Sequence, residues 1–158
     1  MTLIGGGGAV LDRLNPVQDL PVDVVGSVND LYKPEAVLLT GSYASGEASC
    51  DSDIDLILLY ESPPGTRPCA TLLHKGRRVS LSFTPFAALD TMAKMEPVPS
   101  SYGRAGALHA FSSATVMDAA GSEAGRRRAT EVLRLMRKNL KSLAQAMCLY
   151  KTCLALSA

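Results

Sequence analysis

The segment Gly41–Leu56, which reads GSYASGEASCDSDIDL, constrains the fold more than any other part of this 158-residue chain. A Gly-Ser pair follows one apolar run, and Asp53 and Asp55 open a second apolar run that extends to Tyr60. If the second run is a strand, its side chains alternate, so the two carboxylates project from one face about 7 Å apart. Hard divalent cations prefer such oxygen ligands, and a Gly-Ser turn entering a helical turn lets backbone N–H groups approach a phosphate. The segment therefore predicts both a phosphate-binding turn and a metal-binding strand end.

This order of Gly-Ser, a spacer and Asp-x-Asp resembles the nucleotidyltransferase superfamily named after DNA polymerase beta, especially its minimal and aminoglycoside-type members. The resemblance is strong over residues 35–60 and faint beyond them, to about residue 131. It implies metal-dependent transfer of a nucleoside monophosphate from ATP or another triphosphate to a hydroxyl of a small molecule, a protein or an RNA end. Asp53 and Asp55 would bind Mg²⁺ and serve catalysis, and Gly41 and Ser42 would hold the triphosphate. The alternative is a surface loop whose aspartates merely solvate the start of a strand.

The chain departs from the superfamily pattern at two places. The superfamily normally supplies a third carboxylate from a later strand, which here should be 77–84, a segment without an acid. That position falls near Ser80 or Ser82, which are accessory candidates together with Asp51, although solvated surface is the preferred interpretation of Asp51. Many relatives also carry an arginine in the turn after Gly-Ser, where this chain has Ser45. Both departures weaken the prediction of full catalytic power and leave the prediction of the fold unchanged.

Three other acids are weaker candidates for the missing carboxylate. Glu61 would point the same way as Asp55, but six residues of extended strand separate them by about 20 Å. Asp90 and Asp118 could contribute only if the fold brings them to the site. The alternative is therefore a catalytically degenerate member of the superfamily. Such a protein would bind a nucleotide, or a helical partner protein that resembles an antitoxin.

Composition indicates one ordinary globular domain. Hydrophobic residues make up 47% of the chain and charged residues 20%, and the formal net charge is +1. This charge gives no overall attraction to nucleic acids or membranes, and no apolar stretch is long enough for a membrane span. The cysteines show no metal-binding spacing and follow no signal peptide, so free thiols in the cytoplasm are the preferred interpretation of Cys50, Cys69, Cys148 and Cys153.

Periodicity and turn residues predict an α/β (α+β) fold, in which a mixed sheet is flanked by helices and followed by a long C-terminal helix. A short turn at Lys75-Gly76 is expected to join two of the strands. The expected elements are a helix over 16–31, strands over 35–40, 54–60, 69–74 and 77–84, a helix over 85–95, a strand over 110–117, a turn over 118–121 and a helix from 122.

These elements divide the chain into a flexible leader (1–14), a nucleotidyltransferase core (15–121) and a C-terminal helix (122–158). Along that helix an apolar stripe with spacings of three and four comprises Ala129, Leu133, Met136, Leu140, Leu143, Met147, Tyr150 and Leu154. Its first half is expected to cover the core. Its second half is apolar on more than one side, which predicts a homodimer or a helical protein partner.

Two basic clusters are interpreted as solvated charges. His74, Lys75, Arg77 and Arg78 surround the expected hairpin turn and could reach a phosphate, but exposed turn charges are common. Arg126–Arg128 lies in the first turns of the last helix, where the helix dipole disfavours cations. An anion or partner could explain the second cluster, although exposed arginines are tolerated there.

Overall fold

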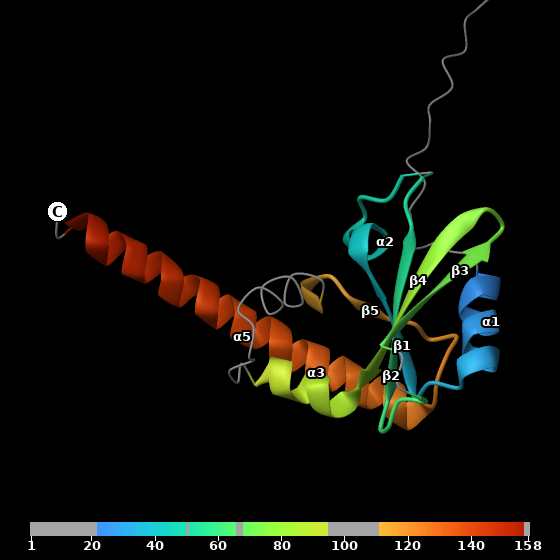
Figure 1. Ribbon diagram of the computed structural model, residues 1–158. Coiled ribbons are helices and arrows are strands. Elements are labelled where there is room, and N and C mark those ends of the chain that lie inside the picture. The colour runs from blue at the N-terminus through green and yellow to red at the C-terminus, as the bar shows by residue number, and fades with distance from the viewer. Residues whose placement is uncertain (1–21, 50, 66–67, 95–110, 157–158) are drawn as a thin grey trace, which may run out of the picture.

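The computed structural model of this protein describes residues 22–49, 51–65, 68–94 and 111–156, with side chains described only between residues 24 and 141 of these ranges. Five strands form one sheet in the order β3-β4-β2-β1-β5 (Figure 1). The β2–β4 pair is parallel and the other pairs are antiparallel. The elements are α1 (Val22–Tyr32), β1 (Ala36–Thr40), α2 (Gly41–Ser45), β2 (Ile54–Tyr60), β3 (Cys69–His74), β4 (Arg77–Pro85), α3 (Phe86–Ala93), β5 (Thr115–Val116) and α5 (Glu123–Leu156).

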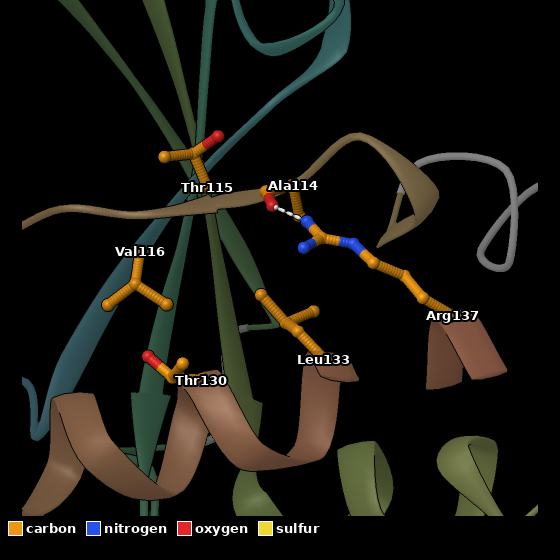
Figure 2. Close-up of a pocket in the computed structure, with 6 residues that line it drawn as sticks. All are labelled: Ala114, Thr115, Val116, Thr130, Leu133 and Arg137. Carbon is orange, nitrogen blue, oxygen red and sulfur yellow. Dashed lines mark hydrogen bonds between the residues drawn. The ribbon is translucent and has the colours of Figure 1, made fainter. Parts of the chain in front are cut away.

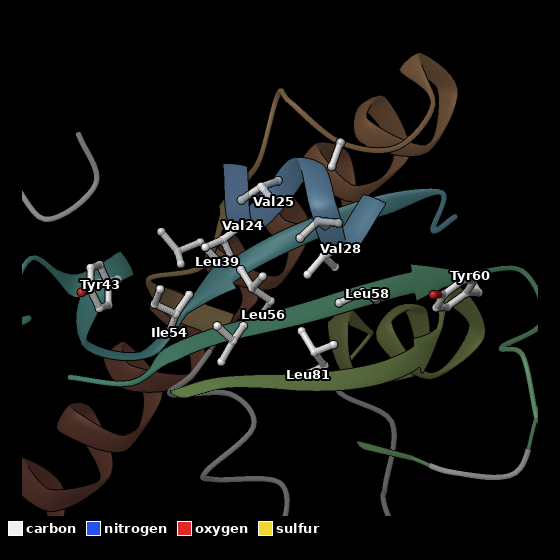
Figure 3. Packing of buried hydrophobic residues seen from close by; sticks show 13 residues of the cluster. Val24, Val25, Val28, Leu39, Tyr43, Ile54, Leu56, Leu58, Tyr60 and Leu81 are labelled. Carbon is white, nitrogen blue, oxygen red and sulfur yellow. The ribbon is translucent and has the colours of Figure 1, made fainter. Parts of the chain in front are cut away.

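One face of the sheet packs against α1. Alternate residues of each strand point to this face, and they meet a row of valines on the helix (Figure 3). The buried residues of this layer are Val24, Val25, Val28, Val37, Leu39, Tyr43, Ile54, Leu56, Leu58, Tyr60, Val79, Leu81 and Ala120. The carboxylates of Asp53 and Asp55 therefore belong to the opposite face.

The opposite face is covered at one end by α3 and α5. The cluster there combines Ala36, Leu38 and Leu59 of the sheet with apolar residues of both helices. Gly125 brings α5 against the chain before β1, because a Cβ at Gly125 would lie 2.0 Å from the backbone oxygen of Glu35. The other end of this face, where β1 ends and β2 begins, does not belong to the buried cluster under the two helices.

The structure confirms the mixed sheet, the flanking helices and the long C-terminal helix. The strands over 54–60 and 69–74 have the predicted bounds, and Lys75 and Gly76 form the turn with φ of 48° and 80°. The first helix ends at Tyr32, one residue later than predicted, and its predicted start lies outside the described residues. Further predictions concern residues outside them: the flexible leader, irregular structure over 100–106, a packed or exposed His109, and the stripe side chains Leu143, Met147, Tyr150 and Leu154.

The predicted strand over 110–117 is wrong for most of its length. Only Thr115 and Val116 pair with β1, and Phe111 and Ser112 form a helical turn. The nitrogen of Ala114 bonds to the oxygen of Phe111, and Arg137 of α5 donates to the carbonyls of Ser112 and Ala114. These carbonyls are therefore held by a distant arginine, and Phe111 is buried in the helical layer instead of continuing the sheet edge.

The N-terminal half of α5 covers the sheet as predicted. Ala129, Leu133 and Met136 are buried, and Leu140 packs against the same cluster. In Figure 1 the rest of α5 extends well past the sheet. No helix in the described part of the chain has both the length and the apolar character that crossing a membrane requires.

Candidate functional site

The two aspartates of the Asp-x-Asp pattern lie where three central strands meet at one end of the sheet. Asp55 pairs with Thr40 at the end of β1 and with Ser80 near the start of β4. The adjacent pair joins Ile54 to Val79 with both side chains buried on the α1 face. Because side chains alternate along a strand, Asp53 and Asp55 share the opposite face.

The Gly-Ser turn lies directly against this strand end. Gly41 has a φ of 67°, a conformation that favours glycine. A Cβ built on Gly41 would lie 2.4 Å from Oδ2 of Asp55, so any side chain there would displace the carboxylate. The glycine thus allows the backbone to approach the carboxylate closely. Ser42 follows within α2, as the sequence predicts, and α2 ends at Gly46 in a left-handed conformation.

Asp53 forms an ion pair with Arg78, which was predicted from the sequence to be a solvated charge in a turn. Nε and Nη2 of Arg78 both donate to Oδ2 of Asp53, at 2.8 and 2.5 Å. The Arg78 side chain is 61% exposed and the Asp53 side chain 35% exposed. Arg78 precedes Ser80 by two residues on β4, so it shares the face of Ser80. The two-residue spacing of Arg78 and Ser80 could have predicted that Arg78 lies near the aspartates. That prediction also requires that β4 lies next to β2, which the sequence does not show.

The electrostatic environment raises the pKa of Asp55. Burial is the largest cause and the negative charge of Asp53 is the second, while a hydrogen bond from Ser80 and the charge of Arg78 act in the opposite direction. Two carboxylates at one strand end therefore repel each other, and the Arg78 charge offsets only part of this repulsion. A divalent cation would offset more of it, because it favours the ionised form of both groups.

Of the two serines offered for the missing carboxylate, the structure brings only Ser80 to the aspartates. Ser80 is directly beside Asp55 and hydrogen-bonds to its carboxylate. Ser82 is exposed one step along the same face, beside Ile57 and Cys69. Asp51 is exposed in a turn before β2, which agrees with its interpretation as solvated surface.

The three alternative acids lie at the other end of the sheet. Glu61 follows the end of β2, and Arg128 of α5 binds both Glu61 and Asp90 of α3. Asp118 is exposed in the turn after β5, which runs antiparallel to β1 and therefore away from Thr40. None of the three can complete the site at Asp55.

The remaining basic residues hold parts of the fold together. Arg77 packs over the ring of Tyr43 and donates to its hydroxyl, which ties β4 to α2 on the α1 face. Arg126 donates to the carbonyls of Ala120 and Gly121, and Arg127 pairs with Glu123.

Ser45, which is predicted to stand at the arginine position of the superfamily, donates to Glu47 and to the oxygen of Ser42.

The described residues contain no group of three or more His, Cys, Asp or Glu side chains that could hold a metal ion. A separate hollow of about 180 Å³ lies between β5 and α5 (Figure 2). Its lining offers no carboxylate and comprises Ala114, Thr115, Val116, Thr130, Leu133 and Arg137. The hollow is smaller than the ~300 Å³ at which ligand pockets usually begin, so the aspartate pair is the stronger candidate site.

Residues 22–96, a little under half of the chain, match the family model described as a nucleotidyltransferase domain. The matched region runs from α1 past α3 and includes Gly41, Ser42, Asp53, Asp55 and Ser80. Among curated proteins, no sequence matches the chain significantly.

Proposed function

We propose that this protein transfers a nucleoside monophosphate from a triphosphate to an acceptor hydroxyl, because residues 22–96 match the model of a nucleotidyltransferase domain and carry the Gly-Ser and Asp-x-Asp pattern of the DNA polymerase beta-like superfamily. ATP with Mg²⁺ is the proposed donor. The observation that carries the proposal is the approach of the Gly41 backbone to the carboxylate of Asp55, with Asp53 on the same strand face. This arrangement joins a turn open to phosphate with a pair of acids suited to a cation.

The donor set fits a single divalent cation. Magnesium in phosphate-transfer sites is commonly held by one or two carboxylates together with substrate phosphates and water. Asp53 and Asp55 provide two carboxylates, and burial together with the charge of Asp53 raises the pKa of Asp55, so a bound cation would favour its ionised form. The bound ion would polarise the phosphoryl oxygens and offset the negative charge that develops on them.

The chain's own groups would position the reactants. Gly41 would allow the triphosphate to lie against the turn without steric conflict, and Ser42 would offer its hydroxyl and backbone to the phosphates. Asp53 and Asp55 would orient the donor through the cation. Holding two reactants in line is itself a large part of such catalysis.

A second candidate function is nucleotide binding with little or no transfer. It is favoured by Ser80, which lies beside Asp55 and which we assign to the position of the superfamily's third acid. A serine hydroxyl cannot accept the acceptor's proton at neutral pH as a carboxylate can. The two candidates differ in turnover and share the nucleotide site.

Label transfer separates these candidates. The full chain is incubated with α-³²P-labelled nucleotides, magnesium and a cell extract, and the products are resolved by size and nuclease or protease sensitivity. We expect a labelled product that the D53N/D55N variant does not form. Binding of labelled nucleotide with no product would support the non-catalytic candidate, and absence of both would contradict the proposed function.

We also propose that the C-terminal half of α5 binds a second copy of the chain. The helix has 34 residues, about 51 Å at 1.5 Å per residue, and its described packing on the core ends near Leu140. Beyond this point the sequence continues the apolar stripe. Two such helices could bury their stripes against each other, at about 1.5–3 kcal/mol for each large side chain.

The double change L143E/M147E is expected to convert a dimer into a monomer, since it places charges in the middle of the proposed stripe. Analytical ultracentrifugation measures the change. The matched control S142E/Q145E adds the same charge at polar positions and should remain dimeric. A wild type that sediments as a monomer at high micromolar concentration would contradict the proposal of a dimer.

A further inference from the structure

The ion pair between Arg78 and Asp53 places a positive charge inside the proposed cation site. Arg78 and Ser80 alternate on β4 beside Asp53 and Asp55 on β2, so all four side chains share one face. Both donor nitrogens of the guanidinium bond to the same oxygen, Oδ2 of Asp53. One of the two proposed metal ligands is thus already engaged by a cation.

We propose that Arg78 couples the binding of the divalent cation to the binding of the triphosphate. The proposal rests on the proposed function, because it concerns the same site. In the absence of nucleotide, the guanidinium neutralises Asp53 and disfavours a free cation there. When the triphosphate binds, Arg78 gains a second anionic partner, so that releasing Asp53 to the cation costs less.

Electrostatics supports the first half of this proposal. Coulomb repulsion between like charges varies inversely with distance, so a divalent ion bound by Asp53 and Asp55 would lie in the strong field of the adjacent guanidinium. The charge of Arg78 also reaches Asp55, whose pKa it lowers. With Ser80 in place of a third acid, two carboxylates and one arginine leave the cluster with one net negative charge.

The exposure of Arg78 supports the second half. Its side chain is 61% exposed, so the guanidinium can turn away from Asp53 without unpacking the core. A guanidinium presents its donors in a planar fork that matches phosphate oxygens. By contrast, Arg77 is held against Tyr43 on the other face of the sheet. Of these two neighbouring arginines, Arg78 is therefore the one positioned to exchange a carboxylate for a phosphate.

The variant R78Q tests the coupling through two separate affinities of the full chain. Affinity for Mn²⁺ without nucleotide is measured by electron paramagnetic resonance of the free ion, and affinity for ATP in EDTA is measured by calorimetry. Because R78Q removes a positive charge that repels the cation and attracts the triphosphate, we expect Mn²⁺ to bind about tenfold more tightly and ATP about tenfold more weakly. Affinity for adenosine, which has no phosphate, should not change.

Opposite changes in one variant distinguish this role from damage to the fold, which would weaken both affinities. R78K keeps the positive charge but lacks the planar guanidinium. Its affinities for Mn²⁺ and ATP should lie between those of R78Q and the wild type. R127Q removes the same charge from an exposed pair with Glu123 and should alter neither affinity.

Unchanged or weaker Mn²⁺ binding in R78Q would overturn the proposed coupling, as would unchanged ATP binding. If Mg²⁺-ATP still stabilises the wild type in that case, the proposed function stands without the coupling. If the wild type binds neither Mn²⁺ nor ATP, the proposed function and the coupling both fail.

Discussion

The double variant D53N/D55N is expected to lose the entire rise in melting temperature that Mg²⁺-ATP gives the wild-type chain. A ligand that binds only the native state at 100 times its Kd stabilises it by about 2.7 kcal/mol. For a chain of this size, that corresponds to a rise of about 5–10 °C. Two neutral amides cannot replace the charge of two carboxylates toward a divalent cation, so the shift should disappear. Differential scanning fluorimetry measures it directly.

The variant itself should remain folded. Asp53 and Asp55 lie at a strand end outside the two buried clusters, and D55N removes a desolvated charge that Asp53 repels. The matched control D30N/D118N removes two exposed aspartates away from the site and should keep the full shift. An undiminished shift in a folded D53N/D55N variant would remove these aspartates from the proposed metal site.

Restoring a carboxylate beside Asp55 is expected to accelerate transfer. The wild type should turn over slowly, because Ser80 lies beside Asp55, at the position that we assign to the third acid that would accept the acceptor's proton. General bases contribute about 10²–10⁴-fold to such reactions, and we expect S80D to recover about tenfold or more of this. Steady-state release of pyrophosphate measures the gain.

Ser82 provides the matched control, because S82D places the same charge on the same strand face one step farther from Asp55. We expect S82D to leave turnover unchanged. Equal rates in S80D and the wild type, with both proteins folded and binding ATP, would show that Ser80 does not replace the missing acid. Equal gains in S80D and S82D would indicate a general charge effect.

Local sequence determined the elements that carry the candidate site. The apolar run from Ile54 to Tyr60 and the Lys75-Gly76 turn predicted strands whose bounds the structure reproduces closely. Gly41 was predicted to let the backbone approach a phosphate; its φ of 67° favours glycine, and a Cβ there would clash with the carboxylate of Asp55. These features depend on side-chain alternation and on the steric freedom of glycine, both of which act between neighbouring residues.

Tertiary structure decided which distant residues meet at the site. Strand direction places Ser80 beside Asp55 and carries Glu61 and Asp118 to the other end of the sheet. Arg78 was interpreted as a solvated turn charge, because its pairing with Asp53 exists only once β4 lies parallel to β2.

The segment before β5 also depends on a distant residue. Arg137, more than 20 residues away, donates to the carbonyls of Ser112 and Ala114. Sequence alone therefore determined the local elements and the identity of the central acids. Packing between remote segments decided the partners of those acids, because hydrogen bonds and ion pairs across a sheet depend on strand order and register.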